Sequence, residues 1–130
     1  MLIIPVKKTE LPIQIGEHKF FIDTSEKGAD EFYKLVEEYS EKSHKIIEKY
    51  EQGLIKPETA DKQSKKEIER VINKLLGVGA FDKLFELSPD YAFISEYYIE
   101  ICHAVTQEIK LRKHRTVKKM MEYTKPAADE

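Results

Sequence analysis

The sequence predicts a mainly α-helical protein, a small domain of about four helices with a short N-terminal β-hairpin or extended arm. Three observations support this fold class. After residue 23, apolar residues recur every three or four positions, which is the spacing of amphipathic helices. The first 23 residues lack that spacing and contain a short alternating run instead. Charged residues make up 35% of the chain, as expected for helices with Lys- and Glu-rich outer faces.

A chain of 130 residues is typical of one domain, and we expect 1–130 to form a single one. We divide it into a hairpin or arm over 1–23, a helical body over 24–123 and a frayed tail over 124–130. With Cys102 as the only cysteine, no intramolecular disulfide can form, which fits a reducing compartment. No run approaches the ~20 apolar residues of a membrane span, and we find no secretory signal, so we expect no membrane partner.

The hairpin is predicted from the stretch LPIQIGEHKFFID, residues 11–23. Ile13 and Ile15 alternate with polar residues, a Gly-Glu-His-Lys turn follows over 16–19, and a second apolar run begins at Phe20. Pro5 and Pro12 have no amide donor, which confines these strands to an edge or to their first residues. Because a small hairpin is only marginally stable alone, it must pack against the rest of the chain.

Two long helices are predicted next. Candidate caps over 23–25 precede a long amphipathic helix, and Gly53 fits its C-terminal end. Its apolar stripe consists of Phe32, Leu35, Val36, Tyr39, Ser43, Ile46, Ile47, Tyr50 and Leu54. Pro57 suits the first turn of the second helix, which is polar at first and apolar between Ile68 and Leu76. Gly77 and Gly79 end this helix, and residues 77–79 form a candidate hinge.

A short third helix is predicted over 80–87, with Phe81, Leu84 and Phe85 on one face. Ser88-Pro89-Asp90 then marks a boundary, with serine as the cap, proline in the first helical position and aspartate facing the helix dipole. The fourth helix is predicted to run to about Tyr123. Its stripe consists of Tyr91, Ile94, Tyr98, Ile101, Cys102, Val105 and Ile109.

No motif predicts chemistry. Gly77-Val78-Gly79 is a bare GxG that follows a helix, whereas a phosphate-binding loop follows a strand. Glu41-x-x-His44 has the spacing of a di-metal carboxylate motif, but the chain has no second copy of it. Cys102 lies on an apolar stripe, where it acts as a small hydrophobic residue. We therefore expect no catalytic residue, metal ligand or cofactor, and no enzymatic activity.

Charge is distributed unevenly along the chain. Residues 110–125 carry seven Lys/Arg and one acid, whereas residues 1–109 carry fifteen Lys/Arg and twenty-one acids. Three interpretations of the basic stretch stay open: a solvated helix end, a docking face for an acidic partner or a second copy, and phosphate contacts with a nucleic acid. The acidic body and the lack of interleaved aromatics make nucleic acid the least favoured. The basic side chains are Lys110, Arg112, Lys113, Arg115, Lys118 and Lys119.

Apolar residues in the C-terminal half exceed what four short helices obviously need. Phe93, Tyr97 and Ile99 lie off the main stripe of the fourth helix, and Phe81 and Phe85 add to them. Two interpretations stay open, a thick core and a protein-binding groove or oligomer interface.

The order of these features resembles the tail assembly chaperones of long-tailed bacteriophages. The resemblance rests on a hairpin-like start ending in FFID, a long first helix, a charged second one, VINKLLGVGAFDKLFEL over 71–87 and an aromatic last helix. Its most specific part is LLGVGAFDKLFE, residues 75–86. The match covers roughly residues 11–110, and the basic stretch lies outside it.

The resemblance implies a helical, non-enzymatic protein that holds the aggregation-prone tape measure protein while the tail tube assembles. It also implies self-association, action in the bacterial cytoplasm and absence from the mature virion. We interpret five side chains as the partner-binding handle, namely Phe81, Leu84, Phe85, Phe93 and Tyr97. Two other hypotheses remain: a small nucleic-acid-binding regulator that uses residues 110–119, and a generic helical adaptor.

Overall fold

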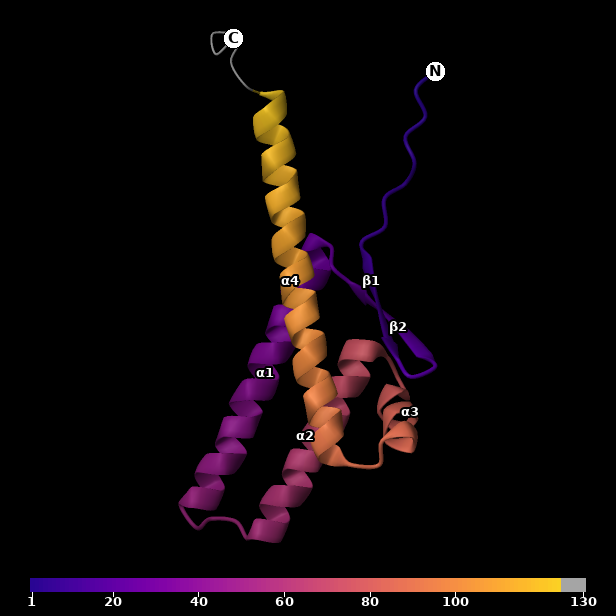
Figure 1. Cartoon of the computed structure of the whole chain (residues 1–130). Helices are drawn as coiled ribbons and strands as arrows, with labels where there is room; N and C mark the ends of the chain where they lie inside the picture. The colour runs from indigo at the N-terminus through magenta and orange to yellow at the C-terminus, as the bar shows by residue number, and fades with distance from the viewer. Residues whose placement is uncertain (125–130) are drawn as a thin grey trace.

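The computed structural model describes residues 1–124 and confirms a mainly helical fold with an N-terminal hairpin. Figure 1 shows α1 and α2 as an antiparallel pair, crossed by the long α4, with α3 and the hairpin beside them. The elements are β1 (Glu10–Ile15), β2 (His18–Asp23), α1 (Glu26–Glu51), α2 (Pro57–Leu76), α3 (Ala80–Leu87) and α4 (Tyr91–Tyr123). Of the tail predicted over 124–130, only Thr124 belongs to the described residues, where it caps α4.

The hairpin turns more tightly than predicted. Ile15 pairs with His18, so the turn contains only Gly16 and Glu17, and the residues after them already belong to β2. Gly16 has a φ of 58°, which suits glycine in the first central position of a two-residue turn. The inward side chains of β2, Phe20 and Ile22, are buried against the helices. The prediction that the hairpin packs against the rest of the chain is therefore confirmed.

The start of α1 is fixed by hydrogen bonds around Ser25, one of the predicted caps. Its hydroxyl accepts a hydrogen bond from the Gly28 amide at 3.1 Å, and its own amide donates to Asp23 Oδ1 at 2.9 Å. A Cβ on Gly28 would lie 2.2 Å from the Asp23 carbonyl oxygen, so only glycine fits there. This turn holds the end of β2 directly against the first turn of α1.

The two glycines predicted to end α2 both have positive φ, 115° at Gly77 and 83° at Gly79. Residues that carry a side chain rarely adopt a positive φ, which explains why glycine occupies both positions. The Asn73 side chain of α2 also accepts a hydrogen bond from the Phe81 amide at 2.9 Å and so fixes the start of α3. The helix stop is confirmed, whereas hinge motion at these glycines stays a prediction.

The cap of α4 differs from the one predicted. Asp90, rather than Ser88, occupies the cap position, and its carboxylate accepts a hydrogen bond from the Ala92 amide at 2.8 Å. Ser88 instead ends α3, and its hydroxyl lies 2.6 Å from that of Tyr97. Because α3 runs to Leu87, the chain needs residues 88–90 to change direction before α4 begins.

The core consists of two adjoining clusters, both in contact with the hairpin. The first lies between α2, α3 and α4 and contains Phe20, Ile68, Val71, Ile72, Ala80, Phe81, Leu84, Ile94 and Tyr98. The second lies between α1 and the middle of α4 and contains Ile22, Ala29, Phe32, Ile101, Val105 and Ile109. Among the described residues, no helix is both long and apolar enough to cross a membrane.

Candidate protein-binding groove

The structure divides the predicted handle into core residues and surface residues. Phe81 is 4% exposed and Leu84 is fully buried, so the prediction that they form a surface handle is wrong. Phe85 is partly buried, and its ring stacks on that of Phe81 at 5.5 Å between centroids. The spacing of these residues does define one face of α3, but that face is turned inward. The thick-core interpretation therefore holds for α3.

Phe93 and Tyr97 instead lie on the surface side of α4. Phe93 is 50% exposed, and Tyr97 is partly buried. They are four residues apart, one helical turn, and Ala104 and Leu111 continue the same side of the helix. Ala104 is exposed and Leu111 is half exposed. This side of α4, which we call the groove stripe, is therefore accessible and mostly apolar, with exposed Glu100 as its charged member.

The groove stripe borders an open groove of about 270 Å³ between α4 and β1. Strand β1 supplies one wall with Pro12, Ile13, Gln14 and Ile15. Helix α4 supplies the other wall with Tyr97, Glu100, Ile101 and Ala104. Figure 1 shows β1 running alongside α4 on this side of the molecule. The groove joins a strand near the start of the chain to the last helix, which no local sequence pattern indicates.

The strand wall of the groove is an open sheet edge. The sheet has two strands, so β1 pairs with β2 on one side only. Pro12 removes one amide donor from β1, and this makes the exposed edge less prone to unwanted strand pairing. The Gln14 amide nitrogen donates to the Gly16 carbonyl at 3.1 Å, which holds that side chain near the turn. The edge thus offers apolar contacts more readily than a full ladder of hydrogen bonds.

Contacts with the rest of the molecule fix the position of the helix wall. The Tyr97 hydroxyl lies within hydrogen-bond distance of the Ser88 hydroxyl, which fixes the ring at one end of the groove. Tyr98 and Cys102 pack on the core side, where burial raises the pKa of both groups, so both stay neutral at neutral pH. Glu100 is the one charged residue among those that line the groove. The surface is therefore suited to an apolar ligand with few charges.

A second hollow, of about 350 Å³, lies between β2 and the start of α1. Its lining includes Asp23, Glu31 and Lys74 beside Phe32 and Leu35. Charged groups of both signs make it a poorer site for an apolar helix than the groove at β1. None of the predicted handle residues lines it.

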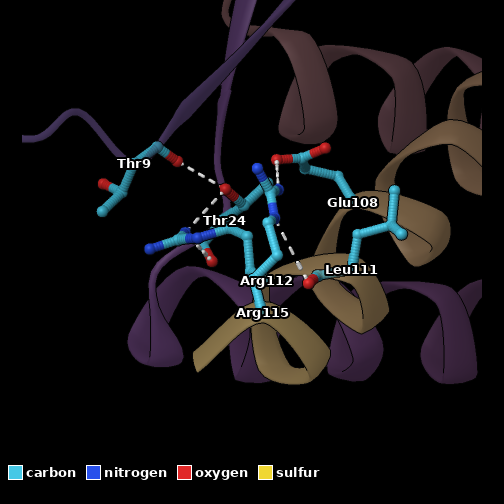
Figure 2. Close-up of polar contacts among 6 residues, drawn as sticks. All are labelled: Thr9, Thr24, Glu108, Leu111, Arg112 and Arg115. Atoms are coloured by element: carbon cyan, nitrogen blue, oxygen red, sulfur yellow. Dashed lines mark hydrogen bonds and ion pairs between the residues drawn. The ribbon is translucent and has the colours of Figure 1, made fainter. Parts of the chain in front are cut away.

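The predicted basic patch is also divided by the structure. The Arg112 guanidinium donates to the Thr24 carbonyl at 2.6 Å and to its hydroxyl at 2.9 Å, as Figure 2 shows. Thr24 is buried, and its own hydroxyl donates to the Thr9 carbonyl at 2.6 Å. Arg112 therefore joins α4 to the β2–α1 junction and is not free for a partner, which corrects its assignment to the patch.

The remaining basic residues lie on the exposed surface of α4. Arg115 contacts Glu108 at 3.2 Å on its own helix. The lysines of the patch are exposed and make no salt bridge within residues 1–124; they are Lys110, Lys113, Lys118 and Lys119. Within the same residues, no group of three His, Cys, Asp or Glu side chains is arranged to hold a metal ion.

Comparison of the chain with protein families, with curated proteins and with solved structures found no match. The resemblance to tail assembly chaperones therefore stays a prediction. Sequence reasoning located Phe93 and Tyr97 but missed the β1 wall, Asn73 and the role of Arg112. The alternation of Ile13 and Ile15 was the available signal for β1, and it did not indicate which helix the strand would meet.

Proposed function

We propose that this protein is a non-enzymatic chaperone that binds apolar helices of the phage tape measure protein and keeps them soluble during tail assembly. In this proposal it acts in the cytoplasm of the bacterial host and is not retained in the mature virion. The proposal combines the resemblance over residues 11–110 with the surface described above.

The observation that carries the proposal is the open groove between β1 and α4, with Tyr97 in its wall and half-exposed Phe93 one helical turn before Tyr97. An amphipathic helix binds such a groove by placing its apolar face against the walls, with anchors spaced three or four residues apart. Phe93, Tyr97, Ala104 and Leu111 follow a matching helical spacing on the groove side. A tape measure chain, as a long helix with apolar stripes, provides many equivalent segments for this contact.

Charge supports the same role. Residues 1–109 have six more acids than Lys/Arg, which keeps the body soluble and discourages contact between bodies. The apolar side chains offered to a client on this side are Tyr97 in the groove wall and half-exposed Phe93 and Leu111 on the stripe. A chaperone of this kind needs an accessible apolar surface and a charged exterior, and it needs no catalytic group.

The test is co-expression with a candidate tape measure chain from the same genome, measuring how much of that chain stays soluble. We expect Phe93→Ser to reduce the soluble fraction at least severalfold, because an exposed aromatic anchor in an interface is typically worth more than about 1 kcal/mol. Ile99→Ser is the matched control, since Ile99 is 65% exposed on the same helix but lies about 120° around it from Phe93 and so outside the groove stripe.

Circular dichroism and thermal unfolding of both variants show whether they fold like the parent chain. Equal loss of client solubility in both variants would contradict a specific groove. A tape measure chain that is equally soluble without this protein would contradict the chaperone function itself.

A further inference from the structure

Strand β2 has a free edge on the side that faces away from β1. The Thr24 amide donates to the Thr9 carbonyl at 2.7 Å, so these two residues form a hydrogen-bonded pair that continues the hairpin ladder. Because hydrogen-bonded and non-hydrogen-bonded pairs alternate in an antiparallel ladder, Lys19 and Phe21 direct their amides and carbonyls away from β1. Within residues 1–124, these groups make no hydrogen bond to another backbone group outside the hairpin. Lys19 and Phe21 therefore each offer a free donor and a free acceptor to an added strand.

The free edge of β1 is less suited to strand pairing than the edge of β2. Its outward positions include Pro12, which lies opposite Phe21 in the register and has no amide to donate. On β2, Lys19 and Phe21 keep their amides, and the first turn of α1 closes the edge only at Asp23, where Gly28 packs. An edge lysine discourages pairing with unselected strands. The edge of β2 is therefore open to a strand that brings negative charge.

Two hollows lie along the free edge of β2. One is the hollow of about 350 Å³ described above, between β2 and the start of α1. The other, of about 360 Å³, lies between β2 and the end of α2, where Figure 1 shows the hairpin beside this helix. Its lining consists of His18, Lys19, Phe20, Phe21, Leu76, Val78, Ala80 and Lys83. Inward and outward side chains of β2 line both hollows and no residue of β1 does, which places the hollows at the free edge.

The hollow beside the end of α2 combines positive charge with apolar surface. The ionisable residues of its lining are His18, Lys19 and Lys83, and each of them is basic. Phe21 is 55% exposed, and Val78 is fully exposed in the loop between α2 and α3. A segment that fills this hollow must therefore bring both an acidic group and apolar contact.

We propose that the edge of β2 binds an extended segment of a partner protein in which apolar residues alternate with acidic ones. The segment adds a strand to the sheet through backbone hydrogen bonds with Lys19 and Phe21. Its side chains alternate between the two faces of the sheet, so those on the helix side enter the hollows beside Leu75 and Leu76. Those on the outer face lie next to Lys19 and Phe21, where a carboxylate opposite the lysine is stabilising.

The N-terminal arm of this chain does not match the charge of the site. Residues 1–6 are exposed and mostly apolar, but Lys7 and Lys8 follow them directly. An arm with two lysines, from the same chain or from a second copy, would bring positive charge to a hollow that is already basic. The edge of β2 shares no lining residue with the groove at β1, so this proposal is independent of the proposed chaperone function.

The experiment is an NMR titration of the isotope-labelled full chain with the peptide acetyl-Val-Glu-Val-Glu-Val-amide. We expect saturable shifts of the Lys19, Phe21 and Val78 amides at peptide concentrations below about 1 mM. Two further peptides test the backbone contact, one with N-methyl groups on the glutamates and one with N-methyl groups on the valines. Because alternate residues of a strand direct their amides to opposite sides, one of these should bind at least tenfold more weakly and the other should bind like the unmodified peptide.

Charge reversal tests the class of ligand. Lys19→Glu should lower the affinity at least fivefold, because it places like charges opposite one another. Lys113→Glu is the matched control on the exposed part of α4, and it should keep the affinity within twofold. The peptide acetyl-Val-Lys-Val-Lys-Val-amide should bind the parent chain at least fivefold more weakly than the glutamate peptide. Circular dichroism should show unchanged helix in both variants.

The absence of saturable shifts up to about 1 mM peptide would overturn the proposal. Equal effects of the two N-methylated peptides would do the same, as would equal effects of Lys19→Glu and Lys113→Glu. Shifts confined to residues 12–15 and 97–104 would place the peptide in the groove at β1 and would also overturn it. Because the titration uses no tape measure chain, none of these results decides the proposed chaperone function.

Discussion

The two halves of α4 are one continuous helix in opposite environments. Between Tyr91 and Arg112, side chains at every third or fourth position are buried, and the last of them is Ile109. From residue 113 onward every described side chain is exposed, although the helix continues to Tyr123. The comparison shows that helix and core end at different places in this molecule. Substitutions in the two halves should therefore have very different effects on the free energy of unfolding.

The largest difference is expected between Ile94→Ala and Val117→Ala. Ile94 is fully buried in the first core cluster, and its truncation should lower the free energy of unfolding by about 2–5 kcal/mol. Val117 is exposed, and its truncation should change the free energy of unfolding by no more than about 0.5 kcal/mol. Urea denaturation of both variants measures these two free energies. Similar losses in both would mean that residues 113–123 of α4 are packed within the isolated chain.

Arg112 marks the boundary between the halves, so Arg112→Met is the next test. It removes two hydrogen bonds and leaves the buried Thr24 with fewer partners, which should lower the free energy of unfolding by about 1–3 kcal/mol. Lys113→Met is the matched control at the neighbouring exposed position. If the two variants are equally stable, the contact between α4 and the β2–α1 junction does not contribute to folding.

The caps of α4 give a smaller contrast between its two ends. Asp90→Ala removes the acceptor for the Ala92 amide and should lower the free energy of unfolding by about 1 kcal/mol. Thr124→Ala removes a hydroxyl bonded to the Met120 carbonyl on the exposed end and should have a smaller effect. Thermal unfolding resolves this difference. A larger loss at Thr124 would contradict the finding that the C-terminal end of α4 is exposed.

The smallest expected effect is on the pH dependence of stability at the β2–α1 junction, which Arg112 contacts. Hydrogen bonds from Ser25, first from its amide and then from its hydroxyl, lower the pKa of Asp23 below its ordinary 3.8. A lowered pKa in the folded state means that Asp23 stabilises the fold above pH 3.8, and that this contribution is lost as the pH falls below that value. Asp23→Asn should therefore reduce stability at pH 7 and flatten its decline in acid. An unchanged acid profile would contradict this role.

Sequence patterns predicted the helices of this protein well because their signals are local. The apolar spacing, Pro57, Gly77 and Gly79 each act within a few residues of the helix end that they define. The same patterns could not tell which apolar face turns inward. Phe81 and Leu84 share a face of α3, as predicted, but only the packing of α3 against α2 and α4 determines that this face is buried.

The groove and the contact of Arg112 depend on residues that are far apart in the sequence. Arg112 and Thr24 are separated by 88 positions, and β1 meets α4 across most of the chain. Neither arrangement leaves a spacing that can be recognised in one sequence. Phe93 and Tyr97 were identifiable because they lie off the buried stripe of a helix whose periodicity is clear.

The most direct test of the central claim is hydrogen–deuterium exchange on this protein, alone and with a tape measure chain. If the groove binds the client helix, protection should increase over residues 12–15 of β1 and 93–104 of α4, and Phe93→Ser should remove that increase. Residues 57–66 of α2 lie outside the groove lining and serve as an internal reference. Protection confined to other surfaces, or no change with the client present, would contradict the groove as the binding site.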